Sequence, residues 1–165
     1  MGLVVTSAEF TPRTAALLER VEAVCGRRGV RLTELRRQVL GLVLDSARPA
    51  GAYDLLERLR PHHRGAAPPT VYRALDFLLE QGLIHKVERL SAFVGCLHGV
   101  EEHDDDEVHH HAAQFLICKR CGQVTELNDR EIGRALLRAA RGWGFALSQS
   151  TVEAEGVCEA CAGAA

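Results

Sequence analysis

The chain has 165 residues, of which 47% are hydrophobic and 25% charged, as expected for a soluble globular protein with one domain or two small ones. It has no run of about 18 apolar residues, and its first residues lack the basic start and apolar core of a signal peptide. We therefore expect a cytoplasmic protein without a membrane partner. In that reducing compartment the six cysteines are expected to be thiols or metal ligands rather than disulfides.

The net charge of −2 is the average of two unlike halves. Residues 1–92 hold 14 basic and 10 acidic side chains, whereas residues 93–165 hold 6 basic and 12 acidic ones. A modestly positive half fits a small DNA-binding module, and the change of charge supports two domains. We place them at residues 1–90 and 91–165.

Helical periodicity dominates the first half. A first helix is predicted from Thr14 to Gly29 and carries Cys25 on its buried face, so that Cys25 is expected to be a core thiol. Thr33 is suited to cap a second helix. Residues 47–51 are typical of a turn, and a third helix follows and ends at Pro61.

A fourth helix begins at two prolines and stops before Gly82. Its apolar positions recur at helical spacing: Val71, Ala74, Leu75, Leu78 and Leu79. Tyr72 and Arg73 lie on the outer face near the N-terminus, where they suit contact with phosphates or base edges, although an ordinary amphipathic helix gives the same pattern. Two short strands are predicted at 83–88 and 92–96, which completes the order of a winged helix-turn-helix.

The second half is predicted to be a small mixed α/β unit. Residues 97–112 form a polar loop rich in acid and histidine, followed by strands at 114–117 and 124–127. Asn128 with Glu131 resembles a capping box for a helix, and further strand is predicted at 145–147 and 150–153. Such a thin core would benefit from a metal, from pairing with another copy, or from both. The predicted fold class is α+β.

Two CxxC knuckles stand out in this half. They consist of Cys118 with Cys121 and Cys158 with Cys161. Four thiolates in two close pairs suit a tetrahedral structural zinc with no open position for water. A thioredoxin-like redox pair is the competing interpretation, but redox motifs seldom occur as two matched knuckles.

A second set of potential ligands is dispersed along the chain: His85, Cys96, His111 and Glu126. Together they offer nitrogen, sulfur and oxygen donors acceptable to a tetrahedral zinc. The thiolate favours zinc over manganese and argues against a site built for ferrous iron. From the pattern alone, a surface histidine and a half-buried cysteine would be the simpler interpretation.

The segment PPTVYRALDFLLEQGLIHKVE, the AYDLL segment before it and the matched knuckles resemble the ferric uptake regulator superfamily, and most closely its zinc uptake regulators. The resemblance runs from about Leu18 to Cys161. It implies a homodimeric, metal-dependent transcriptional repressor. It also implies an N-terminal winged helix joined by a hinge to a C-terminal dimerisation domain.

Carried over by residue, the resemblance assigns a structural zinc to Cys118, Cys121, Cys158 and Cys161. It assigns a regulatory hinge zinc to His85, Cys96, His111 and Glu126, so that each chain would hold at least two Zn²⁺. His111 is chosen because it lies seven positions before Cys118, and His109 and His110 remain alternatives. Tyr53, Tyr72 and Arg73 match DNA-contacting positions of the family, and Thr70 lies at the start of the same helix as Tyr72. Arg36 lies where relatives also carry an arginine, and all five are predicted to bind DNA.

The resemblance implies that the zinc-loaded homodimer binds double-stranded palindromic operator DNA and represses zinc-uptake genes. An iron or peroxide sensor of the same superfamily is one alternative, against which Cys96 argues. A metallohydrolase is another, but no HExxH motif is present. The loop histidines (His98, His103, His109 and His110) could form a third metal site or store zinc, although a solvated acidic loop is the simpler interpretation.

Overall fold

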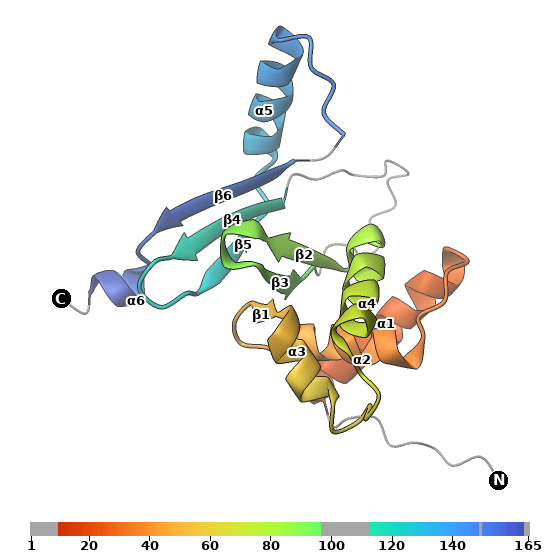
Figure 1. Cartoon of the computed structure of the whole chain (residues 1–165). Coiled ribbons are helices and arrows are strands. Elements are labelled where there is room, and N and C mark those ends of the chain that lie inside the picture. The colour runs from red at the N-terminus through yellow and green to blue at the C-terminus, as the bar shows by residue number, and fades with distance from the viewer. Residues whose placement is uncertain (1–9, 97–112, 149, 164–165) are drawn as a thin grey trace. The chain divides into compact units, whose positions relative to one another are not determined.

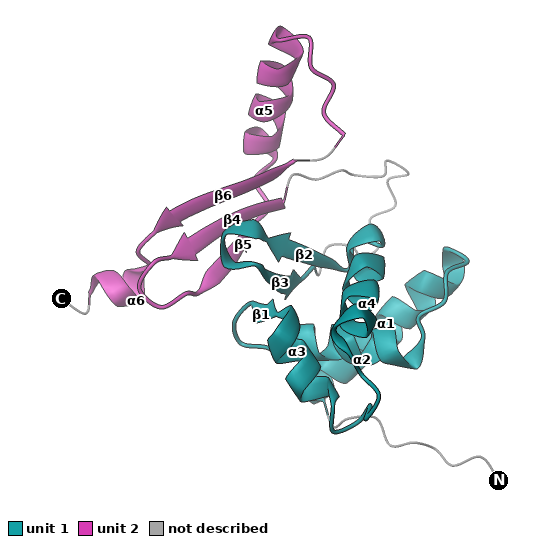
Figure 2. Ribbon diagram, viewed as in Figure 1, with its two compact units in different colours: residues 1–103 teal, residues 104–165 magenta. Residues whose placement is uncertain are grey.

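The computed structural model describes residues 10–96, 113–148 and 150–163. The chain divides into two compact units, Met1–His103 and Asp104–Ala165, drawn in different colours in Figure 2. Within the described residues, no helix is long and apolar enough to cross a membrane. The loop that carries His98, His103 and His109 to His111 lies outside the described residues.

Among its described residues, the first unit contains four helices: α1 (Pro12–Arg27), α2 (Glu34–Leu44), α3 (Ala52–Leu59) and α4 (Pro68–Glu80) (Figure 1). Each contributes apolar side chains to one core, which includes Leu18, Val39, Leu55 and Leu78, all fully buried. Cys25 is 1% exposed in this core, which confirms its prediction as a core thiol. Burying such side chains contributes roughly 2 kcal/mol each, so this unit has an ordinary hydrophobic core.

The predicted fourth helix is confirmed, both in its position in the chain and in the face that it buries. Val71, Ala74, Leu75 and Leu78 are buried on one side of α4. The chain leaves the helix through Gly82, whose φ of 66° lies in the left-handed region that glycine adopts without a steric cost.

The first helix begins earlier than its apolar pattern indicated. Thr11 is its N-cap and accepts a hydrogen bond from the backbone N–H of Thr14, and Pro12 occupies the first helical position. The hydroxyls of Thr11 and Thr14 also donate to Asp45 Oδ1 at 2.8 and 2.7 Å. Asp45 follows the end of α2, so this cluster joins the start of α1 to the end of α2.

A small antiparallel sheet completes the first unit, with strand order β1-β3-β2. Strands β2 (Ile84–Val87) and β3 (Ala92–Gly95) form the predicted wing, joined by a short 3-10 turn, η1 (Glu88–Leu90). Strand β1 (Ala50–Gly51) pairs with β3 where the sequence indicated only a turn. Because β3 pairs on both sides within this unit, it belongs with the helices, whereas the sequence had placed residues 91–96 in the second domain.

The second unit contains β4 (Ala113–Cys118), β5 (Val124–Leu127), α5 (Arg130–Gly142), β6 (Thr151–Gly156) and α6 (Glu159–Ala162). Its sheet has the order β5-β4-β6, with β4 antiparallel to β5 and parallel to β6. Helix α5 projects from one end of this sheet (Figure 1).

Two local predictions in this unit were wrong. Asp129, not Asn128, caps α5 by accepting from the backbone N–H groups of Glu131 and Ile132. Residues 145–147 form no strand, because the chain turns through Gly144 (φ 67°) and enters the sheet only at Thr151.

The core of the second unit is thin, as the sequence indicated. Phe115 and Ile117 are its large buried apolar side chains among the described residues, and helix α5 buries none of its own. Trp143 is 91% exposed and Phe145 64%. Apolar surface of this extent is unusual on an isolated small domain.

Candidate metal centres and nucleic-acid interface

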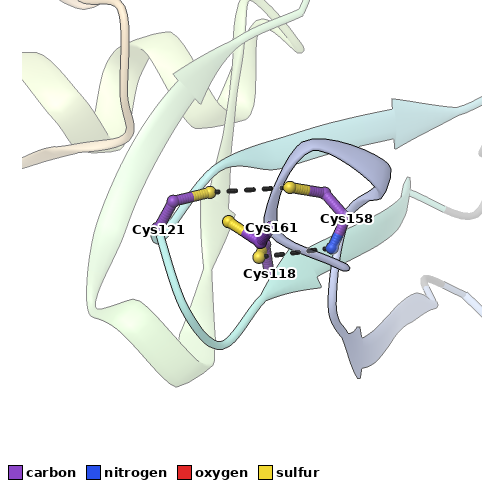
Figure 3. Close-up of side chains that lie close together, drawn as sticks. All are labelled: Cys118, Cys121, Cys158 and Cys161. Atoms are coloured by element: carbon purple, nitrogen blue, oxygen red, sulfur yellow. Dashed lines mark hydrogen bonds between the residues drawn. The ribbon is translucent and has the colours of Figure 1, made fainter. Parts of the chain in front are cut away.

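The four knuckle cysteines converge at one end of the second unit. Cys118 ends β4, Cys121 lies in the turn that leads to β5, Cys158 caps α6 and Cys161 lies within α6. Gly122, with a φ of 71°, lets the first knuckle turn back so that its N–H donates to the carbonyl of Cys118 at 2.9 Å. Figure 3 shows the four sulfur atoms facing one another.

The geometry of this cluster fits zinc. The four sulfur atoms lie within 4.8 Å of one another, and those of Cys121 and Cys158 are 3.8 Å apart. A tetrahedral zinc with Zn–S bonds of about 2.3 Å requires sulfur atoms ~3.8 Å apart. The predicted convergence of Cys118, Cys121, Cys158 and Cys161 is therefore present, and four protein sulfurs fill a tetrahedral shell.

Backbone amides pre-organise one of the sulfurs. The N–H of Cys158 donates to Cys118 Sγ at 3.3 Å and, with the amide of Cys121, lowers the pKa of Cys118 from 9.0 to about 6. The pKa of Cys161 rises to about 12, because Cys158 and Cys121 hydrogen-bond to its side chain. Without a cation, the cluster thus favours thiolate at one position and thiol at another. Zinc, when bound, supplies the positive charge that allows all four to be thiolates.

Arg120 is a contributor that the sequence reasoning missed. In the sequence it lies between the two cysteines of the first knuckle, and its Nη1 donates to the backbone carbonyl of Cys161 in the second knuckle at 2.6 Å. The contact links segments 41 positions apart. A basic residue inside a CxxC motif was the available signal, since four thiolates around Zn²⁺ leave a net charge of −2 for a nearby cation to offset.

Two of the predicted ligands of the regulatory zinc lie together in the first unit. The ligand atoms of His85 and Cys96 are within 4.8 Å of each other. His85 lies on β2 opposite Val94, and Cys96 lies just beyond β3, where its N–H donates to the carbonyl of Leu83 at 2.9 Å. In an antiparallel pair this register places both side chains on the same face of the hairpin. Cys96 is 1% exposed, so its thiol is held in a dry setting.

The other predicted ligands of the regulatory zinc are in the second unit or undescribed. Glu126 is half-buried on β5 and faces Phe115 across the ladder. His111, with its alternatives His109 and His110, lies outside the described residues. Assignment of these side chains to one ion with His85 and Cys96 stays a prediction.

Several predicted DNA contacts are exposed on the first unit. Tyr53, near the start of α3, is 68% exposed, and Tyr72, near the start of α4, is 44% exposed. Arg73 is exposed beside Tyr72, and Thr70 is half-exposed in the first turn of α4. Within this unit, an aromatic and a guanidinium group thus extend outward from the recognition-helix position of a helix-turn-helix.

Arg36 has a different setting. Its guanidinium carbon lies 3.6 Å from the centroid of the Phe77 ring, and its Nη1 donates to the carbonyl of Arg31 at 2.8 Å. The side chain therefore packs α2 against α4 through a cation–π contact. Contact of Arg36 with DNA stays a prediction, and the structure gives this residue a packing task.

Residues 27–155 match the ferric uptake regulator family. The chain belongs to this family. The matched segment contains His85, Cys96, Glu126 and the first knuckle, whereas Cys158 and Cys161 lie just beyond it.

Members of the ferric uptake regulator family similar to this chain include zinc uptake regulators. The zinc uptake regulation protein of Escherichia coli (strain K12) is 45% identical over 148 residues, which cover 90% of this chain and 82% of that protein. The zinc uptake regulation protein of Mycobacterium tuberculosis (strain H37Rv) is 31% identical, covering 81% of this chain and 95% of that protein. A zinc uptake regulator solved in complex with zinc and DNA is 40% identical, with a TM-score of 0.84 over 93% of this chain and 98% of that one.

Proposed function

We propose that this protein is a zinc-responsive transcriptional repressor that binds palindromic operator DNA as a zinc-loaded homodimer and represses zinc-uptake genes. The observation that carries the proposal is the likeness, over 93% of the chain, to a zinc uptake regulator solved with zinc and DNA. The buried Cys96 beside His85 supports the choice of metal, because a thiolate and an imidazole together favour zinc over harder ions.

Each chain would hold two zinc ions with different tasks. The four knuckle cysteines hold the structural ion, whose closed shell leaves no position for substrate. His85 and Cys96 would share the regulatory ion with Glu126 and His111, with His109 and His110 as alternatives to His111. Because these ligands belong to both units, zinc loading would restrict how the first unit is oriented on the second.

The second unit would form the homodimer. Its exposed apolar side chains (Leu116, Leu137, Trp143 and Phe145) offer surface that a second copy can bury. Such a two-fold dimer presents two copies of α4, and a palindromic operator requires them one helical turn of DNA apart, ~34 Å.

The first unit would read the operator. Tyr72 and Arg73 at the start of α4 would reach base edges in the major groove, and Thr70 would contact a phosphate. Tyr53 at the start of α3 would contact the backbone or a thymine methyl group. Arg36 would act indirectly, because its contact with the Phe77 ring holds α4 in place, rather than by extending its own side chain to the DNA.

Zinc control then follows from a population shift. Without the regulatory ion, the first unit of each protomer would sample many orientations and would lose this freedom on binding the operator. A zinc ion ligated by both units would reduce this entropic cost. A coupling free energy between zinc and DNA of about 1–3 kcal/mol per site changes operator affinity by roughly 5- to 150-fold. With two sensing sites per dimer the response can be steeper.

The experiment is an operator-binding titration of the dimer against buffered free zinc, after a mild chelator has removed the regulatory ion and left the structural one in place, with ferrous iron as the matched control. We expect binding to appear over a narrow range of free zinc and not with iron. Operator binding that is independent of zinc, or that iron restores equally well, would overturn the proposal.

A further inference from the structure

Four arginines form a continuous row on α5. Arg130, Arg134, Arg138 and Arg141 recur at i, i+4, i+8 and i+11, which places them within an arc of about 80° on the helix surface. The row is about 16 Å long. All four side chains are exposed, and none forms an ion pair with an acidic side chain among the described residues. We call these four residues the arginine row.

The arginine row opposes the electrostatics of its own helix. Arg130 lies in the first turn of α5, where the helix dipole disfavours positive charge. Neighbouring arginines of the row are three or four positions apart, a spacing at which like charges repel on a helix surface. Four of the six basic side chains of residues 113–163 nevertheless lie in this row. A bound polyanion would neutralise the repulsion, so this arrangement favours an anionic partner.

The arginine row lies opposite the apolar stripe of α5. This stripe consists of Ile132, Leu136 and Ala139, which recur at i, i+4 and i+7, and its centre lies about 170° around the helix from the centre of the row. Ile132 and Leu136 are half-buried. Burial of the stripe by a second copy of the chain would therefore leave the arginine row in solvent.

We propose that the arginine row is a second DNA-binding surface, which contacts the phosphate backbone of a duplex without reading its sequence. A guanidinium group suits this role because its planar fork of N–H donors pairs with a phosphate in a bidentate way. Phosphates advance about 3.4 Å per nucleotide on each strand, so a row of about 16 Å spans roughly five of them. This surface goes beyond the proposed repressor function, and it rests on that function only in that operator binding brings the protein to DNA.

The position of the row favours a duplex over an anionic membrane surface. A helix that lies in a membrane interface buries its apolar face between the headgroups and the acyl chains. In α5 the arginines lie opposite the apolar stripe, so they would point away from a bilayer that this stripe entered. A duplex needs only the row, because its phosphates form a continuous line of negative charge.

The test measures whether the full-length, zinc-loaded protein holds two duplexes at once. The protein is loaded onto a surface-bound operator duplex and washed, and a fluorescent non-operator duplex is then added at about 50 mM salt. We expect the second duplex to be retained, and to be released at about 200 mM salt, because contacts with phosphates weaken steeply with salt. Loading of the protein is recorded separately, so a failure to load would contradict the repressor function rather than the arginine row.

Two matched variants assign the retention to the row. R134Q/R138Q removes two positive charges from the row, and we expect at least fivefold less second duplex at equal protein loading. The control K119Q/Q123E changes the net charge by the same amount at two exposed positions of the second unit outside the row, and should retain the second duplex as the wild type does. Zinc content is measured for both variants. Equal retention by the wild type and R134Q/R138Q would overturn the proposal.

A second measurement does not require operator binding. Y72A/R73A removes two side chains of the proposed reading surface, and its affinity for a non-operator duplex is measured by fluorescence anisotropy against salt. Adding R134Q/R138Q to this variant should lower the slope of log K against log salt by roughly 1.8, because each lost phosphate contact contributes about 0.9. An unchanged slope would contradict the proposal. Row-dependent binding that is tighter to vesicles of phosphatidylserine and phosphatidylcholine than to the duplex would make the row a membrane surface and would also overturn it.

Discussion

Replacing Cys121 by serine should unfold the second unit while the first stays folded. The large buried apolar side chains described in the second unit are Phe115 and Ile117, which contribute roughly 5 kcal/mol together. A structural zinc held by four thiolates contributes on the order of 10–16 kcal/mol. Serine keeps the size of cysteine but removes one of these ligands. The metal term is therefore the larger of the two, and its loss cannot be offset by this core.

The assay combines three readouts on the same sample. Elemental analysis should show the loss of one zinc per chain, sedimentation velocity the loss of the dimer, and hydrogen exchange the loss of protection in β4 but not in α4. The control is Cys25→Ala, which removes a thiol from the core of the first unit and should leave zinc content and dimer unchanged. A zinc-depleted Cys121→Ser dimer with protected β4 amides would refute the reasoning.

Four further changes test separate contacts. Cys96→Ser should leave a folded dimer whose operator affinity, measured by fluorescence anisotropy, no longer responds fully to zinc; an intact response would remove Cys96 from the regulatory site. Arg73→Ala should weaken operator binding by about 1–3 kcal/mol without changing zinc content, and Arg73→Lys should not restore it if the guanidinium fork reads a base. Arg120→Ala removes the hydrogen bond from Arg120 to the carbonyl of Cys161, which joins the two knuckles, and should speed zinc transfer to a chromogenic chelator roughly 10-fold or more. An unchanged transfer rate would show that this hydrogen bond does not help to retain zinc. Asp45→Asn should destabilise the first unit by about 1 kcal/mol at pH 7 in urea unfolding, because hydrogen bonds from Thr14 and Thr11 lower the pKa of Asp45. The difference in unfolding free energy between wild type and variant should be full above about pH 4 and should shrink as the pH falls below it. A difference that persists at pH 2 would contradict this cause.

Elements with a strong period could be predicted from the sequence. The apolar face of α4 was predicted residue by residue, because a buried helix face repeats over several turns and each turn adds the same signal. The same holds for the start of α2, where Thr33 accepts a hydrogen bond from the N–H of Arg36 as predicted. In both cases the sequence signal is local: a repeat along one helix face, or a cap three residues before the amide that it accepts.

Predictions were wrong or incomplete where the deciding contact is distant or two neighbours compete. Asn128 and Asp129 are both good caps, and only the backbone conformation decides that Asp129 accepts the amides. Strand β1 has two residues and exists only because β3 lies beside it. The parallel pairing of β4 with β6 joins positions such as Phe115 and Glu153, and no local pattern encodes this register.

The two candidate metal sites differ in the same way. The knuckles could be predicted because each pair is local and two matched pairs are rarely coincidental. The pairing of His85 with Cys96 depends on the hairpin register, which sets Leu83 opposite Cys96 and His85 opposite Val94. The sequence supplied the two residues through a resemblance, but only the ladder explains why their side chains share a face. Arg120 and Arg36 were missed or assigned differently because their partners, the carbonyl of Cys161 and the ring of Phe77, lie 41 positions away in each case.

The construction of the first unit limits how zinc can change its affinity for DNA. His85 and Cys96 lie on the β2–β3 ladder, and β3 also pairs with β1, from which α3 continues at once with Tyr53. Helix α4 contributes its whole apolar face to the core that α3 and β2 share. Moving Tyr72 relative to Tyr53 would break this core and leave cavities costing about 2–5 kcal/mol for each large side chain uncovered. A coupling of about 1–3 kcal/mol per site is smaller than the cost of uncovering several such side chains, so we expect zinc to act on the orientation of the whole unit rather than on the shape of its recognition surface.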